Sequence, residues 1–223
     1  MKPYYFAEIG LNHMGDTKIL GTLKEKLLKK DIHGISIQIL KDDFYKKNFL
    51  KLKLKNITLV NFIRNVKKKG KLIGVATNDV SRIKFFKKLN IDFYKVLSPD
   101  IKNIDLIKNL INTNCKKVFL STGLANFNEI KFTLDRISKK KISLIHTSFK
   151  KEKIDLNFKR MTKLKKKFGL PICYGNHSKY LKSLIDVKKY KPYGIFFYVK
   201  LDKKLNYPDN IHALNVDKIN SYL

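Results

Sequence analysis

The sequence has little of what defines several protein classes. Two cysteines, Cys115 and Cys173, are too few for a disulfide framework, and no CxxC spacing occurs. No apolar run approaches the roughly 20 residues that a membrane span requires. Glu8 stands where a signal peptide would need an unbroken apolar core. These absences argue against a disulfide-stapled secreted domain and a membrane protein, and we expect a soluble, reduced, cytoplasmic protein.

Arginine is also scarce, although the chain is strongly basic. The sequence carries 49 basic and 18 acidic residues, a formal net charge of +31, and 45 of the basic residues are lysines spread along nearly every segment. Arginine is the side chain that reads guanine edges and holds phosphate through two parallel bonds. A lysine-rich nucleic-acid binder would lose affinity steeply with salt and ignore base sequence. We rank that class last and expect no specific nucleic-acid partner, only an attraction for small anions.

Short β-branched or aromatic runs alternate with longer segments of helical period along the whole chain. Asp16 or Thr17, Asn103, Asn126 and Ser178 are candidate helix caps. The predicted strands are Tyr4–Ile9, Gly34–Ile39, Leu72–Ala76, Asp92–Val96, Lys117–Leu120, Ile142–Ile145, Pro171–Tyr174 and Gly194–Tyr198. The predicted helices are Thr17–Lys30, Asn56–Lys69, Val80–Lys88, Asn103–Asn112, Asn126–Lys139, Asn157–Phe168 and Ser178–Lys189.

Eight such units without a linker or low-complexity block predict an α/β protein, a single (β/α)8 TIM barrel over residues 1–223. Lys41–Lys55 is the longest insertion between predicted elements. A doubly wound open sheet is the alternative. It would not need an eighth strand, and it usually carries a phosphate-binding glycine fingerprint that we do not find here.

Polar side chains follow the ends of the predicted strands, where a barrel builds its catalytic face. The first strand shows the pattern best, because Glu8, Asn12 and His13 follow an apolar run and Gly10 and Gly15 allow the chain to bend. Buried polar groups are costly unless something uses them, so the pattern favours a functional site. The other strand-end groups are Gln38, Thr77, Asn78, Lys95, Ser98, Asp100, Ser121, Thr122, His146, Thr147, Ser148, Asn176, His177 and Asp209.

Six motifs occur in order along the chain: AEIGLNHMG (7–15), YKVLS (94–98), LSTGL (120–124), LIH (144–146), GLPICYGNH (169–177) and, more weakly, YPD (207–209). With these motifs the sequence resembles the N-acetylneuraminate (sialic acid) synthase family. The resemblance implies a barrel enzyme that condenses phosphoenolpyruvate with an N-acetylated sugar aldehyde, giving a nonulosonic acid and phosphate. It also implies a divalent metal, Mn2+ or Mg2+, and allows a homodimer.

The same resemblance assigns roles to individual residues. Thr77, Lys95, Ser98 and Ser121 would surround the phosphate of phosphoenolpyruvate, which as a compact polyanion favours cations and hydroxyl donors. Glu8 would act beside the reacting carbon, and His177 would bind the metal that polarises the aldehyde. The sugar acceptor would contact Gln38, Asp100 and Asp209. Glu8 and Lys95 are therefore the predicted catalytic residues.

Several of these residues also have a purely structural interpretation. Glu8 and Lys95 could form a buried ion pair that only holds the fold, and Ser121 or Thr122 could cap the helix at Asn126. We expect His146 to be a core histidine at the barrel rim. The remaining histidines, His33 and His212, are interpreted as surface residues.

The chain departs from the family pattern at several positions. Ser36 stands where the family has a lysine that contacts phosphoenolpyruvate, with Lys41 as a candidate replacement. The family's second metal histidine aligns with Val199, next to Lys200, so we expect weaker metal binding. Asp100 replaces a glutamate, and the segment Phe149–Glu152 lacks the family's Asn-x-Tyr pair.

The chain also ends at Leu223, so we expect the small C-terminal antifreeze-like domain to be absent. Together with Ser36 and Val199, this motivates an alternative function. In that alternative, the chain is a catalytically impaired barrel that retains an anion- or sugar-binding or assembly role.

Overall fold

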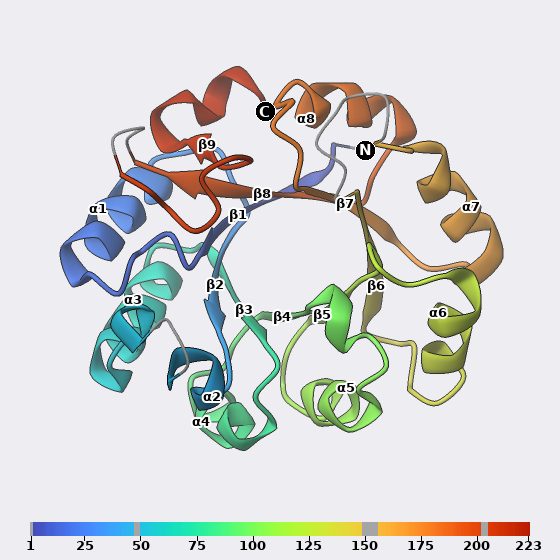
Figure 1. Cartoon of the computed structure of the whole chain (residues 1–223), viewed down its shortest axis with the longest axis horizontal. Helices are drawn as coiled ribbons and strands as arrows, with labels where there is room; N and C mark the ends of the chain where they lie inside the picture. The colour runs from blue at the N-terminus through green and yellow to red at the C-terminus, as the bar shows by residue number, and fades with distance from the viewer. Residues whose placement is uncertain (1, 47–49, 149–155, 202–204) are drawn as a thin grey trace.

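The computed structural model describes residues 2–46, 50–148, 156–201 and 205–223. Eight parallel strands form a closed ring, and helices lie around its outside (Figure 1). The fold is a (β/α)8 TIM barrel, as the sequence predicts. Closure comes from the pairing of the first strand with the eighth, in register from Tyr4 opposite Gly194 to Glu8 opposite Tyr198.

The elements follow one another along the chain in strand–helix units. The strands are β1 (Tyr4–Gly10), β2 (Gly34–Ile39), β3 (Leu72–Thr77), β4 (Phe93–Val96), β5 (Lys117–Ser121), β6 (Ile142–Thr147), β7 (Ile172–Asn176), β8 (Gly194–Lys200) and the short β9 (Leu214–Asn215), which pairs with β8. The helices are α1 (Thr17–Leu28), α2 (Asp42–Phe44), α3 (Asn56–Lys68), α4 (Ile83–Lys88), α5 (Ile104–Ile111), α6 (Phe127–Leu134), α7 (Lys159–Phe168) and α8 (Ser183–Asp186). Short 3-10 helices cover Leu50–Leu52, Val80–Arg82, Ser98–Asp100, Val187–Tyr190 and Val216–Ser221.

All eight predicted barrel strands are confirmed, and the predicted helices differ mainly in length. Asp16, Asn103 and Asn126 cap α1, α5 and α6, the last in a reciprocal capping box with Glu129. The predicted cap at Ser178 is wrong, because α8 begins at Ser183 and the Ser178 hydroxyl instead accepts a hydrogen bond from the Tyr180 N–H. Ser121 and Thr122 lie before the α6 cap and do not replace it.

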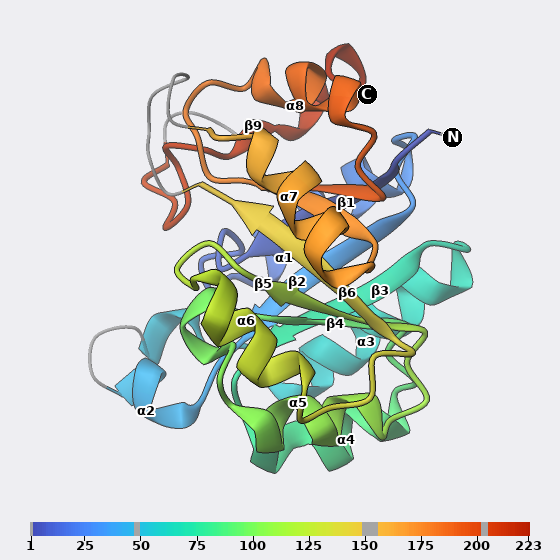
Figure 2. The same cartoon turned by 90° about the vertical axis from the view of Figure 1, so that its right-hand side faces the viewer.

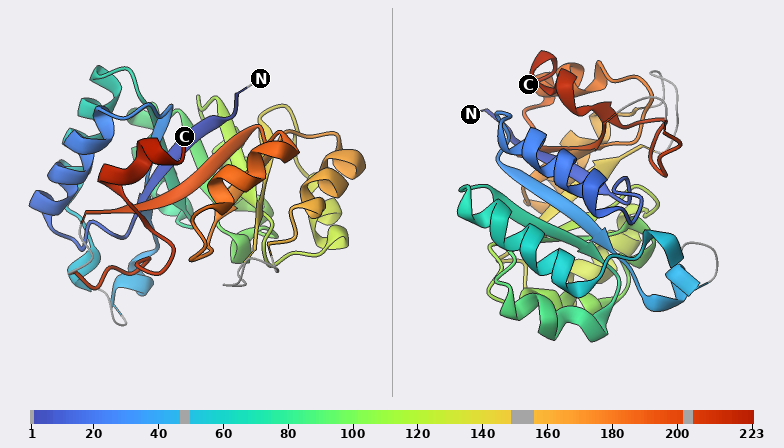
Figure 3. Two further views of the ribbon diagram at one scale, coloured as in Figure 1. Left: turned by 90° about the horizontal axis from the view of Figure 1, so that it is seen from above. Right: turned by 90° about the vertical axis from the view of Figure 1, so that its left-hand side faces the viewer.

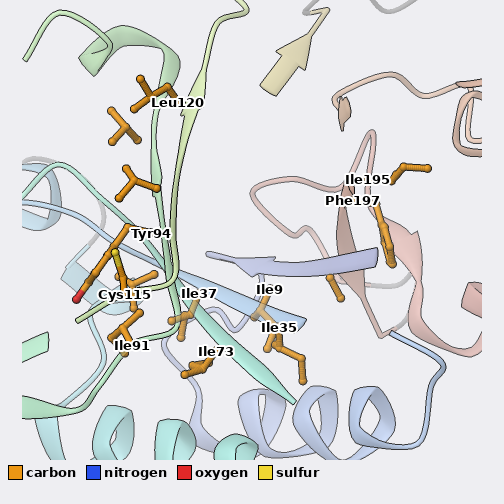
Figure 4. Close-up of a cluster of buried hydrophobic side chains, with 14 of the residues drawn as sticks. Ile9, Ile35, Ile37, Ile73, Ile91, Tyr94, Cys115, Leu120, Ile195 and Phe197 are labelled. Carbon is orange, nitrogen blue, oxygen red and sulfur yellow. The ribbon is translucent and has the colours of Figure 1, made fainter. Parts of the chain in front are cut away.

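The outer core lies between the strands and the surrounding helices. Ile35, Ile37 and Ile73 point outward from β2 and β3 into it, with Tyr94 and Phe197 from β4 and β8 (Figure 4). Figure 2 shows α5, α6 and α7 covering the outside of β5, β6 and β7. On the opposite side, α1 and α3 run side by side, and the C-terminal 3-10 helix packs beside α1 (Figure 3). An ion pair between Lys26 and Asp217 joins α1 to this C-terminal 3-10 helix.

A second apolar cluster fills the inside of the barrel. We call it the inner aromatic layer; it consists of Phe6, Phe93, Phe119, Ile145, Cys173 and Phe196. The rings of Phe6 and Phe196 stack with their centroids 4.5 Å apart. Gly74 makes room for this layer, since a Cβ there would lie 2.0 Å from the Phe93 ring. Side chains alternate along a strand, so the next inward residues toward the carboxyl ends line the barrel mouth.

No helix in the described parts of the chain combines the length and apolar character that crossing a lipid bilayer requires.

Candidate active site

A buried ion pair lies directly above the inner aromatic layer. The Lys95 Nζ atom donates to both carboxylate oxygens of Glu8, at 2.7 and 2.8 Å, and each residue is only 2% exposed. Lys95 follows Phe93 on β4, and Glu8 follows Phe6 on β1, each two residues farther along its strand. A lysine on one strand therefore reaches across the barrel to a carboxylate on another. The Glu8–Lys95 ion pair that the sequence suggested as a structural interpretation therefore exists. The pair also lies toward the carboxyl ends of the strands, where TIM barrels have their active sites.

The neighbours of Glu8 on both sides are set by the strand register. Glu8 is opposite Ser36 on β2 and opposite Tyr198 on β8. On β3 and β4, Ala76 is opposite Lys95. Ser36 and Ala76 are small, which leaves space for the Lys95 side chain to cross the barrel. Ser36 is buried and is paired with Glu8 in the strand register, so the position predicted to have lost a lysine does lie beside the ion pair's strand position.

The loop after β1 holds the chain segment after β8 in place. The Asn12 side-chain amide donates to the Val199 carbonyl at 2.9 Å, and its oxygen accepts the Asp209 N–H at 3.0 Å. Gly10 has φ +56°, and a Cβ on it would lie 2.6 Å from Cε1 of Tyr198 and 3.0 Å from Oδ2 of Asp209. The AEIGLNHMG motif therefore supplies one site carboxylate and also fixes the predicted acceptor residue Asp209. His13 serves the loop itself, since its Nδ1 atom accepts the Gly15 N–H at 2.9 Å.

Two histidines and a tyrosine form an aromatic cluster beside the ion pair. The rings of His177 and His212 stack at 4.7 Å with 25° between their planes, and the Tyr198 ring meets both edge-on, at 5.2 and 5.0 Å. The Lys95 Nζ atom lies 5.5 Å from the Tyr198 ring centroid. The surface interpretation of His212 is wrong, because its ring packs into this cluster with Nε2 3.5 Å from Oδ1 of Asp209.

Burial and neighbouring charge shift the proton equilibria of this cluster. Burial, together with the nearby Lys95 and His212, lowers the pKa of His177 to about 2. Burial raises the pKa of Tyr198 well above its usual value, and the carboxylates of Glu8 and Asp209 add to that rise. At neutral pH, His177 is therefore a neutral imidazole and Tyr198 a neutral phenol.

The arrangement around His177 does not fit the predicted divalent metal. Imidazole lone pairs lie in the ring plane, so two nearly parallel stacked rings do not aim their nitrogens at one point about 2.1 Å from each. The nearby ammonium of Lys95 opposes a dication electrostatically. Val199, expected from the sequence to replace the family's second histidine, is fully buried in the outer core, and Tyr198 is the β8 residue that faces His177. Within residues 2–46, 50–148, 156–201 and 205–223, no three His, Cys, Asp or Glu side chains gather as metal ligands.

The predicted phosphate-binding hydroxyls occupy different surroundings. Ser121 lies on the same inward side of β5 as Phe119, opposite Ile145 of the inner aromatic layer. The Ser98 hydroxyl accepts the Leu124 N–H at 2.7 Å and so joins the loops after β4 and β5. The Thr77 hydroxyl accepts the Asp79 N–H at 3.1 Å. Ser121 is therefore the hydroxyl that the strand alternation places nearest to the ion pair.

The predicted acceptor residues lie higher around the mouth. Gln38 shares the inward side of β2 with Ser36 and is half-buried. Burial raises the pKa of Asp100, and Lys41 is near enough to oppose that rise. Lys41 also lines a hollow of about 450 Å³ together with Asp42, Asp79 and Arg82. The candidate replacement for the missing lysine thus lies at the rim near Asp100.

Arg160 and His146 organise the loop that follows β5. Arg160 on α7 donates to the Thr122 hydroxyl, the Thr122 carbonyl and the Ala125 carbonyl at 3.1, 3.2 and 2.7 Å. The Nε2 atom of His146 lies 2.8 Å from the Leu156 carbonyl, and its Nδ1 atom 3.4 Å from Nη1 of Arg160. A carbonyl only accepts and a guanidinium only donates, so His146 is neutral with its proton on Nε2. The interpretation of His146 as a core histidine at the rim is confirmed.

This neutral His146 is expected to make the fold sensitive to acid. Burial lowers its pKa from 6.5 to about 4, and the charge of Arg160 also lowers it. Between pH 6.5 and 4 the unfolded chain binds a proton at this residue that the folded chain does not, so stability falls as pH falls, by up to about 1.4 kcal/mol per pH unit. The measurement is the urea midpoint from pH 7.5 to 4.5 for wild type and His146→Gln. The variant should lose this part of the slope, and equal slopes for His146→Gln and wild type would contradict the assignment.

The segment Phe149–Glu152, predicted to differ from the family pattern, lies outside the described residues.

Comparison with known proteins agrees with the fold and the ordered motifs. The family model described as NeuB matches residues 25–222. The chain belongs to the NeuB family. It is 26% identical over 226 residues to an uncharacterised protein of Methanocaldococcus jannaschii, covering 96% of this chain and 66% of that protein. It is 24% identical over 246 residues to the N,N'-diacetyllegionaminic acid synthase of Campylobacter jejuni, covering 98% of this chain and 73% of the synthase.

Similar solved structures share the barrel. The N-acetylneuraminic acid synthetase of Leptospira borgpetersenii superposes with a TM-score of 0.91 at 23% identity, over 99% of this chain and 81% of that one. The spore coat polysaccharide biosynthesis protein SpsE of Bacillus subtilis gives 0.86 at 17% identity, over 99% and 66%. NeuB-family membership supports a function like that of the sugar-acid synthases.

Proposed function

We propose that this NeuB-family chain condenses phosphoenolpyruvate with an N-acetylated sugar aldehyde to form a nonulosonic acid and phosphate. The observation that carries the proposal is the Glu8–Lys95 pair, buried in the barrel at 2.7 and 2.8 Å, with Ser121 on the inward side of β5 and His177 packed against Tyr198 beside the pair. A buried ion pair is weak evidence for stability alone. Its place at the carboxyl ends of the strands, in motifs shared with the family, supports a catalytic role.

Lys95 is the proposed anchor for the anionic substrate. Its ammonium would exchange the Glu8 carboxylate for a phosphoenolpyruvate oxyanion, with the Ser121 hydroxyl as a further donor and Ser98 and Thr77 beside it. An ammonium held in a dry site binds an oxyanion through strong charge-assisted hydrogen bonds. Phosphate held in this way is also stabilised as it leaves.

Glu8 and the rim residues have the remaining proposed roles, which are charge stabilisation and acceptor binding. As the enol carbon of phosphoenolpyruvate attacks the aldehyde carbon, positive charge develops on the carbon that carries the phosphate, and the Glu8 carboxylate would stabilise it. Water then adds to that carbon, phosphate leaves, and the aldehyde oxygen becomes a hydroxyl. Asp209, Gln38 and Asp100 would hold the hydroxyls and amide of the acceptor.

A catalytically impaired barrel with an anion- or sugar-binding role is the second candidate. Ser36 favours it, because this buried hydroxyl supplies no positive charge next to Glu8. Lys95 would then be the main cation for an anionic ligand, and ligand binding would not be followed by carbon–carbon bond formation.

Phosphate release separates the two candidates. Purified protein is incubated with phosphoenolpyruvate and a panel of N-acetylated hexoses and related aldoses, with and without Mn2+, and the product is identified by mass spectrometry. Synthase activity predicts acceptor-dependent release of one phosphate for each phosphoenolpyruvate consumed. Calorimetric binding of phosphoenolpyruvate without release for any acceptor would leave only the binding function.

A further inference from the structure

The β8 position that faces His177 belongs to a tyrosine. Tyr198 pairs with Glu8 across β1 and β8, and it follows Phe196 of the inner aromatic layer on the same inward side of the strand. Its ring and the Asp209 carboxylate both lie over Gly10, where a single Cβ would contact both side chains. Tyr198 therefore lies between the predicted phosphate side, with Lys95 and Glu8, and the predicted acceptor side, with Asp209 and His212.

The Tyr198 ring is held by several neighbours. His177 and His212 pack against it edge-on, and Lys95 lies near its face. His212 is fixed in turn by its backbone, because its main-chain N–H donates to the Asp209 carbonyl at 3.3 Å. The Asp209 N–H in turn donates to the Asn12 side chain. A donor fixed before the substrate arrives needs no reorganisation during the reaction, which is the condition for effective electrostatic catalysis.

We propose that this site activates the acceptor without a divalent metal, through a hydrogen bond from the Tyr198 hydroxyl to the aldehyde oxygen. The proposal rests on the proposed function and replaces the metal predicted from the family, for which the stacked histidines are unsuitable. His177 and His212 are then positioning residues that hold the Tyr198 ring.

The chemistry balances without any metal. The enol carbon of phosphoenolpyruvate forms a bond to the aldehyde carbon, and the π electrons of the C=O bond move onto its oxygen, where the Tyr198 O–H stabilises the growing negative charge. That oxygen takes a proton from water. A second water adds to the carbon bearing the phosphate and gives one proton to the hydroxide left by the first. The C–O bond to phosphate then breaks with both electrons leaving on phosphate, which takes the second proton as that carbon becomes the keto group of the product.

Tyr198→Phe tests the hydroxyl while keeping the ring. The expected result is a loss of about 100-fold in kcat, the usual effect of removing one donor to a developing oxyanion, with unchanged binding of phosphoenolpyruvate by calorimetry and an unchanged melting temperature. Tyr94→Phe is the matched control, since Tyr94 is a buried tyrosine on β4 whose side chain faces the outer core, away from the barrel mouth. This control should retain wild-type kcat. Equal kcat for Tyr198→Phe and wild type would overturn the proposal.

Metal dependence is tested on the same wild-type protein. We expect acceptor-dependent phosphate release to persist after chelation with EDTA, and a Mn2+ titration followed by electron paramagnetic resonance to show no stoichiometric site. Release that requires Mn2+, or one Mn2+ bound per chain and lost in His177→Ala, would overturn the metal-free site and leave the proposed function intact. No release under either condition would overturn both proposals.

Discussion

Replacing Lys95 with methionine is expected to lower the free energy of unfolding by about 3–5 kcal/mol, because it leaves the Glu8 carboxylate buried in a closed barrel without its cation. Glu8 is 2% exposed and both of its oxygens bond to Lys95. No compensating cation lies opposite it on the neighbouring strands, where Ser36 and Tyr198 stand. The variant should therefore melt earlier than wild type and bind no phosphoenolpyruvate.

The double variant Glu8→Met with Lys95→Met separates stability from function. Replacing a whole buried ion pair with apolar side chains of similar volume is often neutral or stabilising, so the double variant should recover wild-type stability. It should still bind no phosphoenolpyruvate by calorimetry. That combination would show that the pair is kept for its ligand.

Urea unfolding followed by circular dichroism measures both effects. Lys117→Met is the matched control, since Lys117 is a half-buried lysine at the start of β5 with its ammonium over the Tyr193 ring, and among the described residues it forms no ion pair with a carboxylate. The control should unfold near the wild-type midpoint and retain binding. A double variant as unstable as Lys95→Met would show instead that the pair mainly holds the fold.

Arg160→Met is expected to cost about 1–3 kcal/mol of stability and to reduce kcat. The substitution leaves the Ala125 carbonyl without its donor, and a buried carbonyl left without a partner costs about 1–3 kcal/mol. The Thr122 carbonyl also loses a donor but keeps its hydrogen bond from the Ala125 N–H. The reduction in kcat has a second cause. The loop that Arg160 holds follows directly after Ser121, so its loosening should move a proposed phosphate donor.

Arg136→Met provides the control for Arg160. Arg136 is exposed on the segment after α6, and its guanidinium donates to the Phe132 carbonyl one turn earlier. Surface substitutions of this kind rarely change stability measurably. Equal urea midpoints for the two arginine variants would show that the bonds from Arg160 do not hold the loop.

The fold was predictable because its signal is repeated eight times. Each strand contains alternating or continuous apolar residues, and most caps have the residue types that cap helices. The end of the chain was harder. Ser178 is a residue type that often caps helices, but its hydroxyl accepts a hydrogen bond from the Tyr180 N–H, and α8 begins five residues later. Local preference alone cannot distinguish these uses of a serine hydroxyl.

The site was predictable in part. Glu8, Lys95 and Asp209 were identified from motifs, and the structure brings them together around one mouth. Tyr198 and His212 were missed for different reasons. Tyr198 has a signal in the sequence, since it alternates with Phe196 along β8. His212 has no such signal, because it is brought against His177 by the hydrogen bond between Asn12 and Asp209 and by the turn that follows Asp209.

The inner aromatic layer also governs how the Glu8–Lys95 pair meets solvent. Phe6, Phe93, Phe119 and Phe196 pack ring against ring beneath the pair and provide no polar atom to relay a proton or a water molecule. This floor is also a region of low dielectric constant, so it screens the Lys95 charge poorly and turns its field toward the open end. For the proposed reaction, this floor leaves the carboxyl ends of the strands as the side from which an anion would reach the Glu8–Lys95 pair.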